Sequence, residues 1–170
     1  MTESAHYISS PLKVIVIDIF IMLLLYIIPS LSHLTSIPFY LMDPMRVLVL
    51  GSYIYLSGFK CYKINVYFLA ISLPLISFCL TGHPMFPKNI LISSELVVNL
   101  IFIDFFTKRT EKFFLPILAS IVFSKFFYYL LKWLLISEGF LRTNIIDTSI
   151  VVQFSIALIL SLLFSKYYKR

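Results

Sequence analysis

The chain has 170 residues, of which 60% are hydrophobic and 13% are charged, with a mean hydropathy of +0.96 and a net charge of +6. A soluble domain of this length needs more polar surface than these residues supply, so the composition excludes an ordinary soluble protein. It predicts one all-α integral membrane domain over residues 1–170.

Six apolar runs predict a bundle of six transmembrane helices. A helix that crosses about 30 Å of hydrocarbon needs roughly 20 apolar residues. The first two runs are short, and they must recruit flanking residues or thin the bilayer around them. The expected spans are about 14–28, 45–59, 64–81, 89–106, 113–136 and 149–165.

The distribution of Lys and Arg predicts how the bundle is oriented. When these residues are counted on alternate sides of the expected spans, nine fall on one side and three on the other. Because cytoplasmic loops are enriched in Lys and Arg, we expect both termini in the cytoplasm and a multi-pass protein of the plasma (inner) membrane. The net positive charge is then a topology signal. No nucleic-acid partner is expected, since no aromatic RNA-binding motif accompanies the charge.

The expected outer loops are longer than the inner ones and carry polar side chains. Long loops without regular structure are often lids or binding loops, so the functional surface is expected to face outward. The first outer loop and the start of the second span offer His33, Tyr40, Asp43 and Arg46, and the region around the second outer loop offers Cys79, His83 and Lys88.

These outer residues allow more than one interpretation. His33, Cys79 and His83 have the chemistry of zinc ligands, but their spacing matches no zinc motif. Hydrogen bonding that orders a loop is the alternative role for each histidine. Asp43 is also suited to cap the second helix, with Pro44 in its first turn.

Two of the expected spans carry charges where hydrocarbon is expected. An ionised side chain near the bilayer centre costs about 2.5–3.5 kcal/mol, so such residues need a partner, a wet cavity or a function. One interpretation is a structural ion pair of Glu95 with Lys125 or Lys132; the other is a pocket open to the outside, and the two are compatible. At helical spacing, Lys88, Glu95 and Asn99 share one face of the fourth span, Lys125, Tyr129 and Lys132 share one face of the fifth, and Gln153 lies on the sixth. Nearer the cytoplasm, Asp18 and Asp104 are expected to be structural, with Lys108 and Arg109 as partners.

Three segments resemble the substrate-binding S-components of energy-coupling factor (ECF) vitamin transporters, and most closely the solitary vitamin B12 S-components. They are PSLSHL near 29–34, SFCLTGHPMFPKNILISSELVVN at 77–99 and SKFFYYLLK at 124–132. The resemblance implies a six-helix bundle that binds cobalamin, with the Cys79 thiolate as axial ligand of the corrinoid cobalt and His83 as an alternative donor. It also implies ECF transmembrane and ATPase subunits as partners. The first span, VIVIDIFIMLLLYII, departs from the family because it lacks the Ala-x-x-x-Ala pattern that often mediates docking on them.

The leading hypothesis is therefore an uptake subunit that binds a vitamin-sized solute from outside, with cobalamin as the first choice of bound substrate and no cofactor of its own. No enzymatic activity is expected, because the sequence contains no HExxH, GxSxG, P-loop or dinucleotide fingerprint. The alternative is a small membrane scaffold that binds proteins. A scaffold predicts closed ion pairs beneath a filled core, whereas an uptake subunit predicts a cavity that reaches Glu95 and Lys125.

Overall fold

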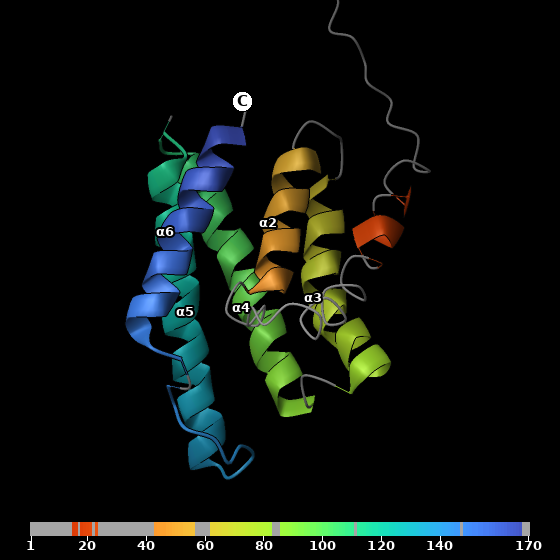
Figure 1. The fold of residues 1–170 in the computed structure, drawn as a ribbon, viewed down its shortest axis with the longest axis vertical. Helices are drawn as coiled ribbons and strands as arrows, with labels where there is room; N and C mark the ends of the chain where they lie inside the picture. Colours follow the sequence, from red (N-terminus) through yellow and green to blue (C-terminus); the bar gives the residue numbers. More distant parts are fainter. Residues whose placement is uncertain are drawn as a thin grey trace, which may run out of the picture.

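The described residues of the protein, in a computed structural model, are almost entirely helical (Figure 1). The helices are α2 (Pro44–Leu56), α3 (Tyr62–Thr81), α4 (Phe86–Thr107), α5 (Phe114–Ser137) and α6 (Ile150–Tyr167). The structure describes residues 15–16, 18–21, 23, 43–56, 62–82, 86–110, 112–146 and 148–167, and the first three of these groups are also helical. No strand occurs in these ranges, so the all-α prediction is confirmed. The five helices begin and end within a few residues of the predicted spans.

Three of the helices are long and apolar enough to cross a membrane: α4, α5 and α6. Helix α2 and residues 63–79 of α3 are shorter apolar helices. Large apolar side chains such as Phe126, Trp133 and Leu162 are exposed along these helices, as contact with lipid requires. The protein therefore has the features of a membrane protein. The count of six spans and the cytoplasmic termini stay predictions, and most of the first expected span lies outside the described residues.

Helix α4 lies at the centre of the arrangement (Figure 1). It packs mainly against α5 on one side and α3 on the other, while α6 packs against α5 and α2. The core between the helices is filled by buried aliphatic side chains that include Leu50, Leu69, Leu100 and Ile121. Helix α4 thus lies between α3 and α5, and α5 also packs against α6. Polar side chains from several helices can therefore meet inside the bundle.

Two glycines end helices at the turns that were predicted to be outside the membrane. Gly82 follows α3 with φ 71°, and Gly139 follows α5 with φ 77°. Both are in the left-handed region, which glycine adopts without steric cost, and the Gly82 N–H donates to the Phe78 carbonyl at 2.8 Å. Both glycines therefore mark helix ends.

Candidate functional site: a charge cluster inside the bundle

Helix α2 begins beside the middle of α4 (Figure 1). Pro44 is its first residue, as predicted, because proline fixes a helical φ and lacks only an N–H that has no intrahelical acceptor. The preceding residue, Asp43, has φ 48°, and its backbone carbonyl accepts a hydrogen bond from the Val47 N–H at 3.2 Å. The late start of α2 carries Arg46 into the interior of the bundle.

Four charged side chains meet at this point. Glu95 lies near the middle of α4 and accepts a hydrogen bond from Arg46 Nη2 through Oε1. The same oxygen lies 2.9 Å from Lys125 Nζ on α5. Asp43 Oδ2 lies 3.3 Å from Arg46 Nε and 3.7 Å from Lys125 Nζ. We call these four residues, Asp43, Arg46, Glu95 and Lys125, the charge cluster. The predicted Glu95–Lys125 pair is confirmed.

The charge cluster is buried at one end and open at the other. The side chains of Arg46 and Glu95 are 3% and 5% exposed, whereas those of Lys125 and Asp43 are each 28% exposed. Desolvation of Arg46 and Glu95 is costly, and it is offset only because each has an opposite charge in direct contact. The Asp43 carboxylate likewise faces two cations, Arg46 and Lys125.

Further polar contacts connect α4, α5 and α6 around the cluster. Asn99 donates to the hydroxyls of Ser120 and Ser124 at 3.5 and 3.3 Å. Tyr129 donates to Gln153 Oε1 at 2.7 Å. One of these contacts joins two residues predicted for the site, Tyr129 and Gln153, whereas Asn99 contacts two serines that were not predicted.

Two buried polar side chains lie nearer the N-terminal end of α4 and the C-terminal end of α5. Lys132 is almost fully buried, two turns beyond Lys125 on the same face of α5. Asn89 is fully buried, and neither the nitrogen nor the oxygen of its side-chain amide has a hydrogen-bond partner among the residues that the structure describes. Since α4 and α5 are antiparallel and Glu95 lies opposite Lys125, Asn89 and Lys132 come to nearly the same level. The half-buried Lys88 precedes Asn89 in the chain.

Of the three residues predicted as metal ligands, the structure describes Cys79 alone. Cys79 is a free cysteine with an exposed side chain. It follows Ile64, Phe68, Ile71 and Leu75 at helical spacing, and all four are also exposed, so Cys79 lies on the outward, apolar face of α3. His33, Tyr40 and His83 lie outside the described residues. Within the described ranges, no three His, Cys, Asp or Glu residues are placed to hold a metal ion.

A second set of polar contacts lies at the opposite end of the bundle. Asp104 accepts hydrogen bonds from Lys63 Nζ at 2.9 Å and from the Tyr53 hydroxyl at 2.7 Å. We call these three residues the inner polar contacts. The prediction that Lys108 or Arg109 pairs with Asp104 is therefore wrong: Arg109 instead lies over the Phe105 ring at 4.1 Å. Nearby, Asn65 donates to Asp18 at 2.9 Å.

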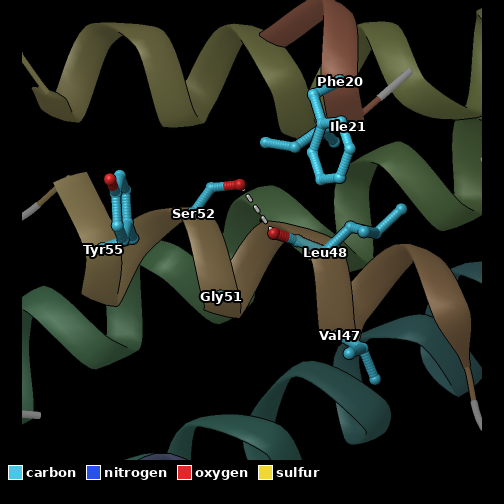
Figure 2. Close-up of a pocket in the computed structure, with 7 residues that line it drawn as sticks. All are labelled: Phe20, Ile21, Val47, Leu48, Gly51, Ser52 and Tyr55. Atoms are coloured by element: carbon cyan, nitrogen blue, oxygen red, sulfur yellow. Dashed lines mark hydrogen bonds between the residues drawn. The ribbon is translucent and has the colours of Figure 1, made fainter. Parts of the chain in front are cut away.

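An apolar groove of about 370 Å³ lies between α2 and the helical residues that precede it (Figure 2). Its lining consists of Phe20, Ile21, Val47, Leu48, Gly51, Ser52 and Tyr55. The Ser52 hydroxyl donates to the Leu48 carbonyl at 2.7 Å, so it is satisfied within α2. None of the described residues that line the groove is charged, so its chemistry differs from that of the charge cluster.

No protein-family model, curated protein or solved structure matches the chain. The site therefore has to be interpreted from its own chemistry. Sequence reasoning placed Asp43 and Arg46 among the outer residues and missed the contact of Arg46 with Glu95 and that of Asp43 with Lys125. One feature of the sequence was consistent with these contacts, the short second apolar run. A helix too short to cross the membrane has an end inside the membrane, and the residues at that end lie there too.

Proposed function

We propose that the protein is a membrane uptake subunit that binds a vitamin-sized solute from the outer face, with the charge cluster as the polar part of its site. The observation that carries this proposal is the meeting of Arg46, Glu95 and Lys125 from three helices inside an otherwise apolar bundle, with Asp43 and Lys125 still partly exposed. Ligand sites commonly combine apolar walls with a few convergent polar groups of this kind.

The number and placement of the charges support a binding role. A single buried pair is sufficient to fix the packing of two helices, and each further buried charge adds a desolvation cost without a packing need. Intramembrane ionisable residues are in general a mark of a substrate or ion pathway. In the proposed site, Asn99, Tyr129, Lys132 and Gln153 supply further polar contacts, Lys88 lies at the entrance, and the outer segments with His33, Tyr40 and His83 form the roof.

Cobalamin is the first choice of solute because of the resemblance to vitamin B12 S-components. In that assignment Cys79 binds the corrinoid cobalt through its thiolate, so the corrinoid has to reach the exposed face of α3 near its outer end. The proposal further includes uptake from the outer face of the membrane and a topology with both termini in the cytoplasm. It also includes ECF transmembrane and ATPase subunits as the partners that drive transport.

The experiment is a visible absorption spectrum of protein purified from cells grown with cobalamin. Wild type, Cys79→Ala and Lys125→Met are compared, with Lys63→Met as the control for loss of a lysine outside the proposed site. The proposal is supported if the protein carries a corrinoid whose spectrum changes in Cys79→Ala. The amount of bound corrinoid should also fall in Lys125→Met and not in Lys63→Met. A protein that neither carries nor binds cobalamin contradicts the cobalamin assignment, and binding of another vitamin then decides whether the uptake role survives.

A second candidate function is a membrane scaffold that binds protein partners, and one observation favours it. Glu95 is in direct contact with two cations and is almost fully buried, which is the closed ion pairing that a scaffold predicts. The two functions differ in whether a solute binds. A scaffold predicts no change in the thermal unfolding of the purified protein with any vitamin, and recovery of the same protein partners from wild type and Lys125→Met.

A further inference from the structure

The charge cluster contains two acidic groups that are held in different ways. Glu95 is deeply buried, is in hydrogen-bond contact with Arg46 Nη2 and lies 2.9 Å from Lys125 Nζ. The Asp43 carboxylate lies 3.7 Å from Lys125 Nζ, which is longer than a hydrogen bond. Glu95 is therefore the fixed counter-ion of the two cations, and Asp43 is the loosely held one.

The donor that faces Asp43 on the buried side is not satisfied. Arg46 Nε lies 3.3 Å from Asp43 Oδ2, yet it makes no hydrogen bond with any atom of the described structure. The Arg46 side chain is 97% buried. A buried guanidinium donor without an acceptor costs free energy, and an anion that fits its geometry better than Asp43 removes that cost.

Two donors lie close to the Asp43 carboxylate at the start of α2, Arg46 Nε at 3.3 Å and Lys125 Nζ at 3.7 Å. We call them the α2 anion site. The first turn of a helix attracts anions through its unpaired N–H groups and its dipole, and an arginine beside it adds a planar donor that matches carboxylate and phosphate oxygens. The site is accessible, because Lys125 and Asp43 are the partly exposed members of the cluster.

Asp43 is also positioned to leave this site. It precedes α2, and its backbone has φ 48°, in the left-handed region that residues other than glycine rarely adopt. Its side chain already has a solvent-accessible part. If another anion takes the place of the Asp43 carboxylate, no buried charge is left without a counter-ion. Glu95 keeps its contacts with Arg46 and Lys125, and the incoming anion replaces Asp43.

We propose that the α2 anion site binds a carboxylate or phosphate group of the transported solute, and that Asp43 occupies the site until this group displaces it. The inference rests on the proposed uptake function and adds the chemical class of the solute to it. A solute anion completes the hydrogen bonding of Arg46. The Asp43 carboxylate is then free to turn toward its solvent-accessible side. Solutes of the same shape with a neutral amide or alcohol in place of the acid lack the charge that the site requires.

The test compares matched acidic and neutral solutes on the purified full-length protein in detergent. The pairs are nicotinate with nicotinamide, biotin with biotinamide, and pantothenate with panthenol, together with inorganic phosphate and cobalamin. Binding is measured by calorimetry and by the shift in unfolding temperature. We expect at least one acidic solute or phosphate to bind about tenfold or more tightly than its neutral counterpart, which corresponds to one charge-assisted contact.

Variants of Asp43 provide the sharper arm of the test. Asp43→Asn and Asp43→Ser remove the internal anion, and both residues keep an N-cap side chain for α2. They are expected to bind the acidic solute about tenfold more tightly than wild type, because no internal carboxylate competes. Arg46→Gln is expected to lose the preference for the acid. Asp104→Asn, which removes a carboxylate from the inner polar contacts, is the matched control and is expected to bind as wild type does.

The outcomes separate this inference from the proposed function. Equal binding of acids and neutral counterparts, binding of a neutral solute alone, or weaker acid binding in both Asp43 variants overturns the anion site and leaves the uptake role standing. Cobalamin carries a phosphodiester group, so cobalamin binding that Arg46→Gln leaves unchanged does the same. Absence of binding for every solute, cobalamin included, overturns both.

Discussion

The charge cluster and the inner polar contacts are built from the same chemistry at different depths. In each, a lysine ammonium lies 2.9 Å from a carboxylate oxygen of α4: Lys125 with Glu95, and Lys63 with Asp104. The side chains of Lys63 and Asp104 are 43% and 19% exposed, whereas Glu95 and its second partner Arg46 are at most 5% exposed. Equal distances therefore do not imply equal energies.

The difference teaches which of the two sets has a candidate function. An ion pair near the ends of helices remains hydrated, contributes about 0–1 kcal/mol and is lost at little cost. A pair in the interior has given up its hydration, so each charge depends on the other for compensation. Charges that remain in the interior despite this cost need a reason, and solute binding is the reason that we propose. Four predictions test the comparison, from the largest expected effect to the smallest.

Removal of the central carboxylate is expected to have the largest effect. Glu95→Gln leaves Arg46 buried without its close counter-ion and weakens the hold on Lys125. We expect the free energy of unfolding to fall by about 3–5 kcal/mol, the range for breaking one side of a buried pair. Denaturant unfolding in detergent micelles measures the loss. A change as small as that in Asp104→Asn would show that depth does not separate the two sets.

Simultaneous removal of both partners is expected to cost less than the two single losses together. In Arg46→Met with Glu95→Met, neither charge is left uncompensated inside the bundle. The coupling energy from the double-mutant cycle is expected to be about 2–3 kcal/mol, the upper part of the range for residues in contact. The corresponding cycle for Lys63 and Asp104 should give less than about 1 kcal/mol. Similar coupling energies in the two cycles would contradict the comparison.

Asn99 provides a polar but uncharged contact in the same interior. Its bonds to Ser120 and Ser124 are long, and both serine hydroxyls also donate to carbonyls one turn back, at 2.7 and 2.9 Å. Asn99→Leu therefore leaves no serine donor unsatisfied, and it removes a buried amide oxygen that has no partner in the described structure. We expect a change within about 1 kcal/mol of wild type. A loss above 2 kcal/mol in thermal or denaturant unfolding would mean that neutral polar contacts also depend on depth.

Lys63→Met is expected to have the smallest effect on stability. Lys63 is nearly half exposed, so its contact with Asp104 competes with water, and Tyr53 continues to donate to the Asp104 carboxylate. The expected loss is below about 1 kcal/mol, and it should shrink further as salt is raised. Unfolding measured at low and high ionic strength checks both statements. A loss comparable with that of Glu95→Gln would place the inner polar contacts in the same class as the charge cluster.

The sequence predicted the helices well because a bilayer restricts which segments can cross it. Apolar runs of sufficient length, and Gly82 and Gly139 at their ends, identified α3, α4, α5 and α6 to within a few residues. Helical spacing also placed Glu95 opposite Lys125, since both residues lie near the middle of their helices on faces rich in polar residues. These are local patterns, and local patterns can be obtained from one sequence.

The contact of Arg46 with Glu95 could not be obtained in this way. It depends on where α2 starts relative to α4, and this offset is set by packing between helices that are distant in the sequence. The partner of Asp104 was mispredicted for a related reason: Lys108 and Arg109 are close in sequence, but Lys63 on α3 is closer in space. The motif around Cys79 likewise did not determine which face of α3 carries this residue. In the structure Cys79 lies on the exposed face, which points away from the other helices.

The central claim is that the charge cluster is reached from the outer side of the membrane. It is tested most directly by placing a cysteine at Lys125 in a background with Cys61→Ser and Cys79→Ser, and treating intact cells with a membrane-impermeant maleimide. Phe126→Cys is the matched control, because it has the same depth on α5 but an exposed, lipid-facing side chain. The account predicts labelling at position 125 without permeabilisation, and little or none at position 126. Labelling at position 125 only after permeabilisation, or equal labelling at both positions, would contradict an outward-facing polar site.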